Sequence, residues 1–185
     1  MNAQTITINT KGDAQVVIDV TPRIVDLLMP RIGQRAPLTV TEETHTKVLA
    51  DGLKLPGSSS RTDHVAVIDH ATGLMWAVKS IGDSDGDPMS QADCEKACSE
   101  LRLLGHDDWR LPTRGELAAL VDDTRHEPAI DTALFPGVQP RWHWTSTAAA
   151  WSSASAWLVS FSYGYVDDYP RGSYGFALAV RGAGQ

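Results

Sequence analysis

The stretch GHDDWRLPTRGELAALVDD, residues 105–123, joins a tryptophan, a Leu-Pro step and a short amphipathic segment, yet holds almost no reactive side chain. Thr113 followed by Glu116 has the spacing of a capping box, in which each side chain bonds the other residue's backbone amide at a helix start. The apolar side chains that follow recur at helical spacing and are Leu117, Leu120 and Val121. The stretch is therefore predicted to end a loop and begin a helix.

The loop before this helix contains the residues expected to fix it in place. Trp109 is predicted to be its anchor, because an indole buries a large apolar area. Arg110 is expected to donate hydrogen bonds to loop carbonyls, and Pro112 to stop the chain from extending further. Trp109, Pro112, Trp144 and Trp157 are predicted to support the fold without touching a ligand.

A second helix is predicted upstream, in SQADCEKACSELRLL (residues 90–104). Ser90 is a plausible N-cap residue, and the apolar residues at helical spacing are Ala97, Leu101 and Leu104. The only two cysteines, Cys94 and Cys98, lie four residues apart on this helix. They are expected to be buried or half-buried free thiols; a strained disulfide is the alternative, and their redox state stays open. No further ligands stand nearby for a metal site.

Five segments are predicted as strands from their β-branched and aromatic residues, namely 64–69, 73–79, 143–147, 156–161 and 176–181. In the fourth, alternation puts Trp157, Val159 and Phe161 on one face and Leu158, Ser160 and Ser162 on the other.

The N-terminal part has a different character. TITINT and QVVIDV alternate apolar and polar residues around KGDA, which predicts a hairpin. A short helix-like segment is expected at 22–30, a strand within 37–49 and a linker at 51–63. These patterns divide the chain into a β-rich oligomerisation or docking segment, 1–60, and a main domain, 61–185. Self-association as a homo-oligomer is expected, with dimer and trimer both open.

Composition narrows the function classes. The chain has 185 residues, 42% of them hydrophobic, and a net charge of -7 that argues against nucleic-acid binding. No apolar run is long enough to cross a membrane, and the N-terminus does not resemble a secretory signal. Synthesis in the cytoplasm is therefore expected, with no membrane insertion; the final location is open, and association with a virion is one alternative.

Five motifs occur in one order: TGLMW (72–76), the DWRLPTRGEL region (98–117), WTST (144–147), AWLVSFSYG (156–164) and ALAVRG (177–182). The series resembles the domain at the C-terminus of Legionella collagen-like adhesins, in the formylglycine-generating-enzyme branch of the C-type-lectin-like fold. The resemblance implies an α+β fold with two helices and small antiparallel sheets. It also implies a binding site on a loop-rich face near the C-terminus, where phage tropism determinants and variable proteins of diversity-generating retroelements display their variable residues.

The residues favour binding over catalysis. WRLPTRGEL is similar to a segment of formylglycine-generating enzymes, but those oxidases use cysteines late in the domain, and no cysteine follows Cys98 here. The chain is therefore predicted not to be an enzyme and to have no catalytic residue. The acidic run GDSDGDP (82–88) departs from calcium-loop spacing, so a solvated turn is expected, no metal ligand is assigned and calcium is the alternative cofactor.

The C-terminal third is rich in Tyr, Ser and Asp, the residues that binding loops use. One exposed ligand-binding patch is predicted, consisting of Trp151, Ser153, Ser155, Tyr163, Tyr165, Asp167, Asp168, Tyr169, Arg171, Ser173 and Tyr174. The expected function is recognition of a cell-surface or other macromolecular ligand, protein or glycan, as in a phage receptor-binding protein or a retroelement-diversified protein. The alternatives are a structural virion or assembly component, and an oxidase-type or calcium-linked member of the fold.

Overall fold

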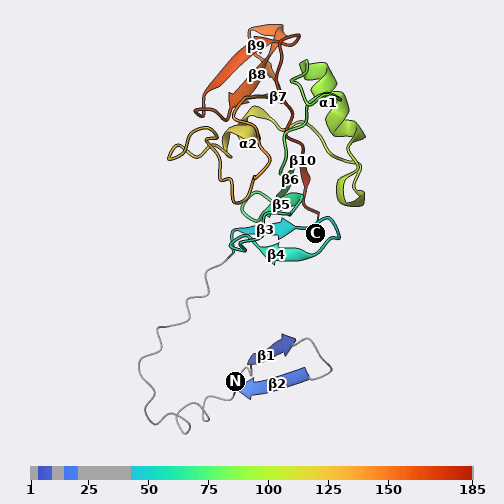
Figure 1. Cartoon of the computed structure of the whole chain (residues 1–185), viewed down its shortest axis with the longest axis vertical. Helices are drawn as coiled ribbons and strands as arrows, with labels where there is room; N and C mark the ends of the chain where they lie inside the picture. The colour runs from blue at the N-terminus through green and yellow to red at the C-terminus, as the bar shows by residue number, and fades with distance from the viewer. Residues whose placement is uncertain (1–3, 10–14, 21–42, 185) are drawn as a thin grey trace. The chain divides into compact units, whose positions relative to one another are not determined.

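The computed structural model describes residues 4–9, 15–20 and 43–184, and the chain divides into two compact units, Met1–Thr41 and Glu42–Gln185 (Figure 1). In the first unit, β1 (Gln4–Asn9) and β2 (Gln15–Val20) pair antiparallel, with Ile6 opposite Ile18. This pair is the hairpin that the alternating sequence predicts. The helix-like segment expected at 22–30 lies outside the described residues.

The second unit contains a five-stranded sheet in the order β10-β6-β5-β3-β4, and every neighbouring pair in it is antiparallel. Its strands are β3 (His45–Val48), β4 (Lys54–Pro56), β5 (Ala66–Asp69), β6 (Leu74–Ala77) and β10 (Val180–Gly182). The described part of the strand expected within 37–49 is β3.

The stretch predicted as a linker, 51–63, is instead part of this unit. It contributes β4 to the sheet, and the buried Lys47 donates hydrogen bonds from Nζ to the carbonyl oxygens of Ser59, at 2.6 Å, and Arg61, at 3.0 Å. The composition of residues 51–63 could not indicate this, because the lysine that holds the segment lies outside it and bonds only to backbone carbonyls. The division between residues 60 and 61 suggested by the sequence therefore falls inside the second unit.

A three-stranded antiparallel sheet, in the order β7-β8-β9, lies at the end of this unit farthest from β3 and β4 (Figure 1). Its strands are β7 (Trp142–Ala149), β8 (Ser152–Ser160) and β9 (Val166–Pro170). The chain before β10 connects the two sheets, because Phe176 bridges to His143 on β7 and Val180 pairs with Trp76 on β6. The C-terminal segment thus joins both halves of the unit.

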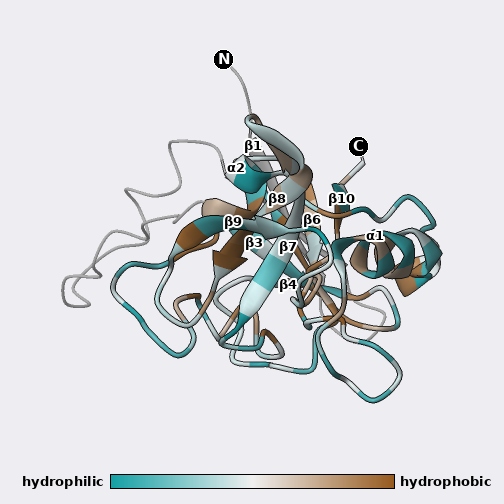
Figure 2. Ribbon diagram, turned by 90° about the horizontal axis from the view of Figure 1, so that it is seen from above, coloured by the Kyte–Doolittle hydropathy of each residue, from teal (hydrophilic) through white to brown (hydrophobic). Residues whose placement is uncertain are grey.

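The first helix, α1 (Gln91–Glu100), begins at Ser90, whose Oγ accepts a hydrogen bond from the Asp93 amide. Its buried residues are Gln91, Cys94 and Cys98, so the expected apolar stripe was wrong. The helix ends before Leu101, and Leu104 belongs to a 3-10 turn, Leu103–Gly105, where its backbone φ is 56°. Figure 2 shows that most of α1 is hydrophilic, as expected for a helix that buries one narrow face.

The second helix, α2 (Arg114–Ala118), has the predicted capping box, with both the Thr113 and Glu116 side-chain bonds present. Leu117 is fully buried, whereas Leu120 and Val121 follow the short helix and are half-buried. Two helices and small antiparallel sheets confirm the predicted α+β class. Among the described residues, none of the helices has the length and apolar character needed to span a membrane.

Two hydrophobic clusters lie on opposite faces of β8. Ala156 and Leu158 belong to the cluster that contains Trp109 and Trp144, whereas Val159 and Phe161 belong to the cluster around Trp76 and Leu117. The alternation along this strand is therefore as predicted, and both of its faces are buried over this length. Because β8 is packed on both sides, it forms a rigid support for the strands beside it.

Candidate ligand-binding surface

All five predicted aromatic residues are exposed: Trp151 at 67%, Tyr163 at 56%, Tyr165 at 66%, Tyr169 at 38% and Tyr174 at 75%. Of the predicted polar residues, Ser153 and Asp167 are exposed, and Ser155, Asp168, Arg171 and Ser173 are half-buried. The predicted patch thus contains no fully buried residue.

The structure does not bring these residues into one patch, because β9 is an edge strand with two accessible faces. Tyr169 lies opposite Ala156 and Asp167 opposite Leu158, so both point to the face of β8 that carries Trp144. Asp168 lies opposite Trp157 and points to the other face. Strand alternation therefore separates neighbouring residues of the predicted set.

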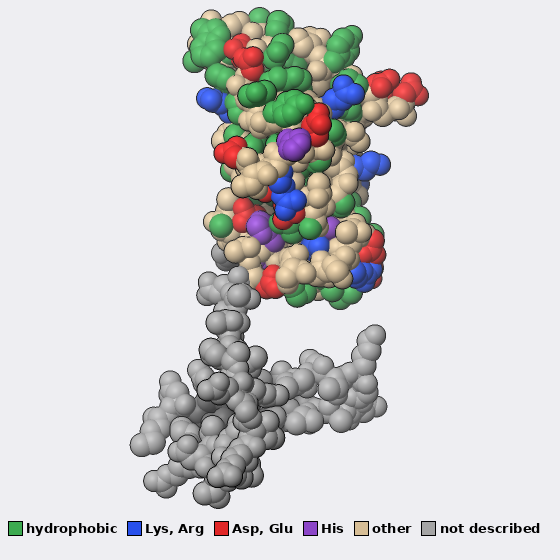
Figure 3. Space-filling model, turned by 60° about the vertical axis from the view of Figure 1, so that its left-hand side comes forward, with side chains coloured by type: hydrophobic (Ala, Val, Ile, Leu, Met, Phe, Trp, Pro, Cys, Tyr) green, Lys and Arg blue, Asp and Glu red, His purple; other side chains and the backbone are tan. Residues whose placement is uncertain are grey.

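The larger group forms what we call the tyrosine face, consisting of Trp142, Tyr163, Tyr165, Asp167 and Tyr169. The rings of Tyr163 and Tyr165 have centroids 6.2 Å apart, and those of Trp142 and Tyr169 are 5.5 Å apart. Tyr163 also donates a hydrogen bond to Glu127 at 2.9 Å, and this bond raises the pKa of its hydroxyl. Figure 3 shows many hydrophobic side chains on the surface at the upper end of the unit in this view.

Trp142 was missed by the sequence interpretation. It lies on β7 opposite Ser160, two residues before the buried Trp144, and is half-buried. The available signal was its alternation with Trp144, which puts both indoles on one face of the strand, with Trp142 at the first residue of the strand.

The second group lies on the other face of the sheet, around Trp157. The Trp151 ring packs edge-on against Trp157 with centroids 5.4 Å apart, and the Arg114 guanidinium carbon lies 3.9 Å from the centroid of the Trp157 ring. Trp157, predicted as a framework residue, is half-buried, and the Trp151 ring beside it is exposed. Arg114 is thus held by a cation–π contact at the start of α2.

Arg171 connects elements inside the protein. Its Nε donates to the Ser153 carbonyl at 2.9 Å, and its Nη1 donates to the Gln91 side-chain oxygen. Gln91 in turn donates to the Thr145 carbonyl at 2.7 Å, so the chain of bonds ties α1 to β7 and β8. Two of the guanidinium N–H groups of Arg171 are already engaged in these bonds. The role of this residue is therefore chiefly to hold the surrounding elements together.

Tyr174 stands apart from both groups. It precedes Gly175, which bridges to Met89 next to the start of α1. A Cβ atom at position 175 would lie 3.0 Å from the Trp144 ring, so the backbone must pass closely over that indole. Tyr174 therefore projects beside α1, where it lines a surface depression with Asp93 and Lys96.

The backbone edge of β9 offers few free amide hydrogens for strand addition. The Asp168 amide donates to Asp167 Oδ1 at 2.9 Å, and Pro170 has no amide hydrogen to offer. Charged residues and proline on an edge strand prevent another chain from pairing with it. The groups that this edge offers to another molecule are therefore chiefly side chains.

The side chains of residues 105–123 fix the loop before α2 to the rest of the unit. The Arg110 guanidinium donates to the Leu111 carbonyl at 3.1 Å, as predicted, and to both Glu116 oxygens, at 2.7 and 2.9 Å. This pairing is the main reason why the pKa of Glu116 falls to about 2. Asp108 accepts a hydrogen bond from the largely buried Arg181 at 2.6 Å, which ties the loop to β10.

The histidine and cysteine side chains considered next are buried, and burial shifts their pKa values. Ser80 Oγ lies 2.7 Å from Nε2 of the fully buried His143, whose Nδ1 lies 3.0 Å from the Arg141 carbonyl. Burial lowers the pKa of His143 to about 4, which makes it a weak base for activating a serine. Burial also raises the pKa values of the free thiols Cys94 and Cys98 to about 12, so neither is a thiolate at neutral pH.

The acidic run 82–88 folds into a turn held by its own hydrogen bonds. Asp83 Oδ1 accepts from the amides of Asp85 and Asp87, each at 2.9 Å. Across the part of the chain that the structure describes, no three His, Cys, Asp or Glu side chains gather as they would around a metal ion.

Comparison with family models and with curated proteins gives the following results. No curated protein matches the chain. The family model of the Lcl C-terminal domain matches residues 65–181, which is more than half of the chain. The matched range runs from the start of β5 into β10 and includes both helices and the whole tyrosine face. The chain belongs to the Lcl C-terminal domain family.

Proposed function

We propose that the protein is a non-enzymatic recognition protein that binds a macromolecular ligand through its tyrosine face. Membership of the Lcl C-terminal domain family indicates an adhesin-like or recognition role. The observation that carries the proposal is the group of exposed aromatic rings on the edge strand β9 and on the turn before it, where Tyr169 is 38% and Tyr165 is 66% exposed. Aromatic residues that are exposed together on a soluble surface commonly mark a binding site.

The physical basis is that the rings stand on a backbone that is already ordered. Tyr and Trp offer large contact areas while losing only two side-chain torsions on binding. β9 is paired with β8, which is packed on both faces, so little backbone freedom remains to be lost when a ligand binds. Asp167 lies between Tyr165 and Tyr169 on the same face and supplies hydrogen-bond acceptors.

The ligand we propose is a protein or glycan on a cell surface. A phage receptor-binding protein or a retroelement-diversified protein is the finer form of this proposal. It is supported by the position of the exposed side chains, which project from β9 and its turn and can change without disturbing the core. A reverse-transcriptase gene and an imperfect repeat of the 3′ end beside this gene would support diversification.

Replacing Tyr165 and Tyr169 together with Ala is expected to reduce binding at least tenfold, because aromatic residues contribute disproportionately to binding energy. The melting temperature should change little, since exposed substitutions usually cost within about 0.5 kcal/mol each. Binding of the labelled full chain would be measured on glycan arrays and on intact bacterial cells. Calorimetry of each variant reports its stability.

The matched control for this experiment is Leu53→Ala, which removes an exposed apolar side chain, 50% accessible, from the turn between β3 and β4. It should leave binding unchanged. Unfolding of the double variant, or unaltered binding to every surface that the native chain recognises, would contradict the proposed site. Equal binding losses in both variants would point to nonspecific apolar adhesion.

The full chain is expected to self-associate through its N-terminal part, as a dimer or trimer. β1 and β2 form a two-stranded sheet, and such a pair is at best marginally stable alone in water. Multi-angle light scattering should therefore give a mass two or three times that of one chain, whereas a fragment of residues 43–185 should be monomeric. A monomeric full chain at micromolar concentration would show that this expectation is wrong.

A further inference from the structure

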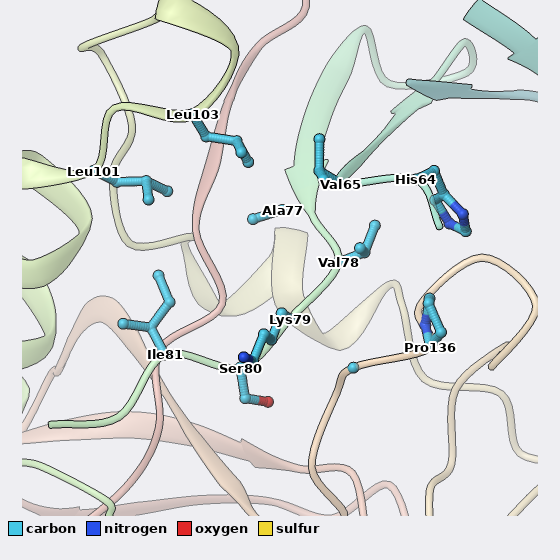
Figure 4. A pocket seen from close by; sticks show the side chains of 11 residues that line it. His64, Val65, Ala77, Val78, Lys79, Ser80, Ile81, Leu101, Leu103 and Pro136 are labelled. Carbon is cyan, nitrogen blue, oxygen red and sulfur yellow. The ribbon is translucent and has the colours of Figure 1, made fainter. Parts of the chain in front are cut away.

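A cleft beside β10 differs from the other hollows of the second unit in containing a buried charge. Figure 4 shows a hollow beside the end of β6, with Ile81, Leu101 and Leu103 along one side of it. Its walls are mainly apolar, and apolar walls alone do not specify the chemistry of a ligand. The cleft beside β10 has a volume of about 780 Å³, within the range of small-molecule sites, and is lined by Arg181.

This cleft lies over one face of the five-stranded sheet. Arg181 on β10 is directly opposite Met75 on β6, and the two side chains therefore share a face. Lys54 on β4 is opposite Val48 on β3 in the same way. Val48 and Met75 belong to one hydrophobic cluster, so both pairs stand on the same face of the sheet. The turn that contains Leu104 completes the lining from outside the sheet.

Arg181 retains a hydrogen-bond donor that faces the cleft. The residue is 8% exposed, its Nε donates to Asp108 Oδ1 at 2.6 Å, and its Nη1 lies 3.9 Å from the weak acceptor Met75 Sδ. Its Nη2 makes no hydrogen bond with any described residue. The fully enclosed side-chain atoms without a partner in the described chain are His64 Nδ1 and Trp76 Nε1, so Arg181 Nη2 keeps accessible surface. Because Arg181 lines the cleft, this donor is open to it.

The charges at the cleft favour a ligand with a single negative charge. Arg181 and Lys54 are positive, whereas Asp51 in the lining and Asp108 beside Arg181 are negative. These four charges sum to zero, and His106 in the lining adds a positive charge only when it is protonated. The cleft therefore has little excess charge to offset a doubly charged anion such as phosphate. A single carboxylate needs less, because a guanidinium N–H donates a strong, charge-assisted hydrogen bond to it.

We propose that this cleft binds a small organic monocarboxylate, whose carboxylate accepts hydrogen bonds from Nη2 of Arg181. The hydrocarbon part of the ligand packs against Met75, Leu104 and Ala183, which also line the cleft. The bond from Arg181 Nε to Asp108 stays in place and holds the guanidinium group in position. The proposal is independent of macromolecular recognition at the tyrosine face and can fail or succeed separately.

The test uses the full chain, labelled with ¹⁵N, and follows titrations by NMR at low and constant ionic strength, so that screening of charges stays weak. Benzoate and benzamide are the probes, because they have nearly the same shape and differ in charge. Benzoate is expected to give saturable shifts at the backbone amides of Met75, Leu104 and Arg181. It should bind about tenfold more tightly than benzamide, as a charge-assisted hydrogen bond permits.

Two variants locate the binding. Arg181→Lys keeps the positive charge but removes Nη2, so it should weaken benzoate about tenfold and leave benzamide unchanged. Lys54→Glu is the second test, which does not depend on the folding of Arg181→Lys, because Lys54 is exposed. It reverses one charge at the cleft and should weaken benzoate about threefold. The matched control, Lys96→Glu, makes the same change on α1, at a position that does not line the cleft, and should bind benzoate as the native chain does.

Several results would overturn the proposal. They include the absence of saturable shifts at millimolar benzoate, equal affinity of the native chain for benzoate and benzamide, and unchanged benzoate binding in Arg181→Lys. Equal losses in Lys54→Glu and Lys96→Glu would show that binding reflects only the overall charge of the protein. Inorganic phosphate that binds as tightly as benzoate would make this a general anion site and contradict the assignment to carboxylates. Shifts confined to the amides of β9 would assign the probe to the tyrosine face instead.

Discussion

Replacing Trp109 with Ala is expected to lower the free energy of unfolding by about 3–5 kcal/mol, the range found for deleting large buried aromatic side chains. Trp109 is 2% exposed and belongs to the cluster that includes Cys98, Leu111 and Trp144. Its Nε1 donates to the Leu103 carbonyl at 3.3 Å, so the substitution also removes one of the two hydrogen bonds that this carbonyl accepts, the other coming from the His106 amide. The loss follows from the cavity and the missing hydrogen bond together.

Urea denaturation followed by circular dichroism measures this change, and Trp151→Ala is the matched control. Trp151 is 67% exposed, so removing the same side chain there should cost less than about 1 kcal/mol. A loss below about 1 kcal/mol for Trp109→Ala would show that the indole does not anchor the loop.

The stability of the protein is expected to fall by about 3 kcal/mol as the pH is lowered from 6.5 to 4, because of His143. Burial lowers the pKa of this fully buried histidine from 6.5 to about 4. Between these pH values the unfolded chain takes up a proton that the folded chain does not bind. Acid therefore shifts the equilibrium toward the unfolded chain, and the loss is complete only once the pH has fallen below the folded-state pKa.

The measurement is the free energy of unfolding at several pH values for the native chain and for His143→Gln. The glutamine can retain a hydrogen bond with Ser80, and it does not titrate, so its stability should depend less on pH over this window. Glu116 affects stability at lower pH than His143 does. Its pKa falls from 4.5 to about 2, so its contribution to stability is lost as the pH drops through that range. Parallel pH profiles for both proteins between pH 6.5 and 4 would rule out the assignment to His143.

Local interactions could be predicted from the sequence because neighbouring residues make them. Thr113 and Glu116 form the predicted capping box, and Ser90 caps α1 as expected. The order of five motifs led to the correct family and to the α+β class. Tyr and Trp side chains between apolar framework positions were correctly expected to be exposed, since strand alternation turns every second residue outward.

The burial of Cys94 and Cys98 on α1 was expected, but the third buried residue of this helix, Gln91, was missed because it is polar. Gln91 is 1% exposed and is stable there because its side chain donates to Thr145 and accepts from Arg171. These partners lie 54 and 80 residues away along the chain. A pattern of hydrophobicity cannot reveal a polar residue whose hydrogen bonds come from such distant segments.

The sequence by itself determined the helix caps, the strand alternation, the family and the set of exposed aromatic residues. Only the tertiary structure decided how that set divides, placing Tyr165, Asp167 and Tyr169 on one face of the sheet and Trp151 on the other. It also decided that Trp142 joins the tyrosine face and that Arg171 is held by Ser153 and Gln91. The physical reason is that β9 is the edge of its sheet, and which face a residue joins depends on its register with β8, which is fixed by long-range packing.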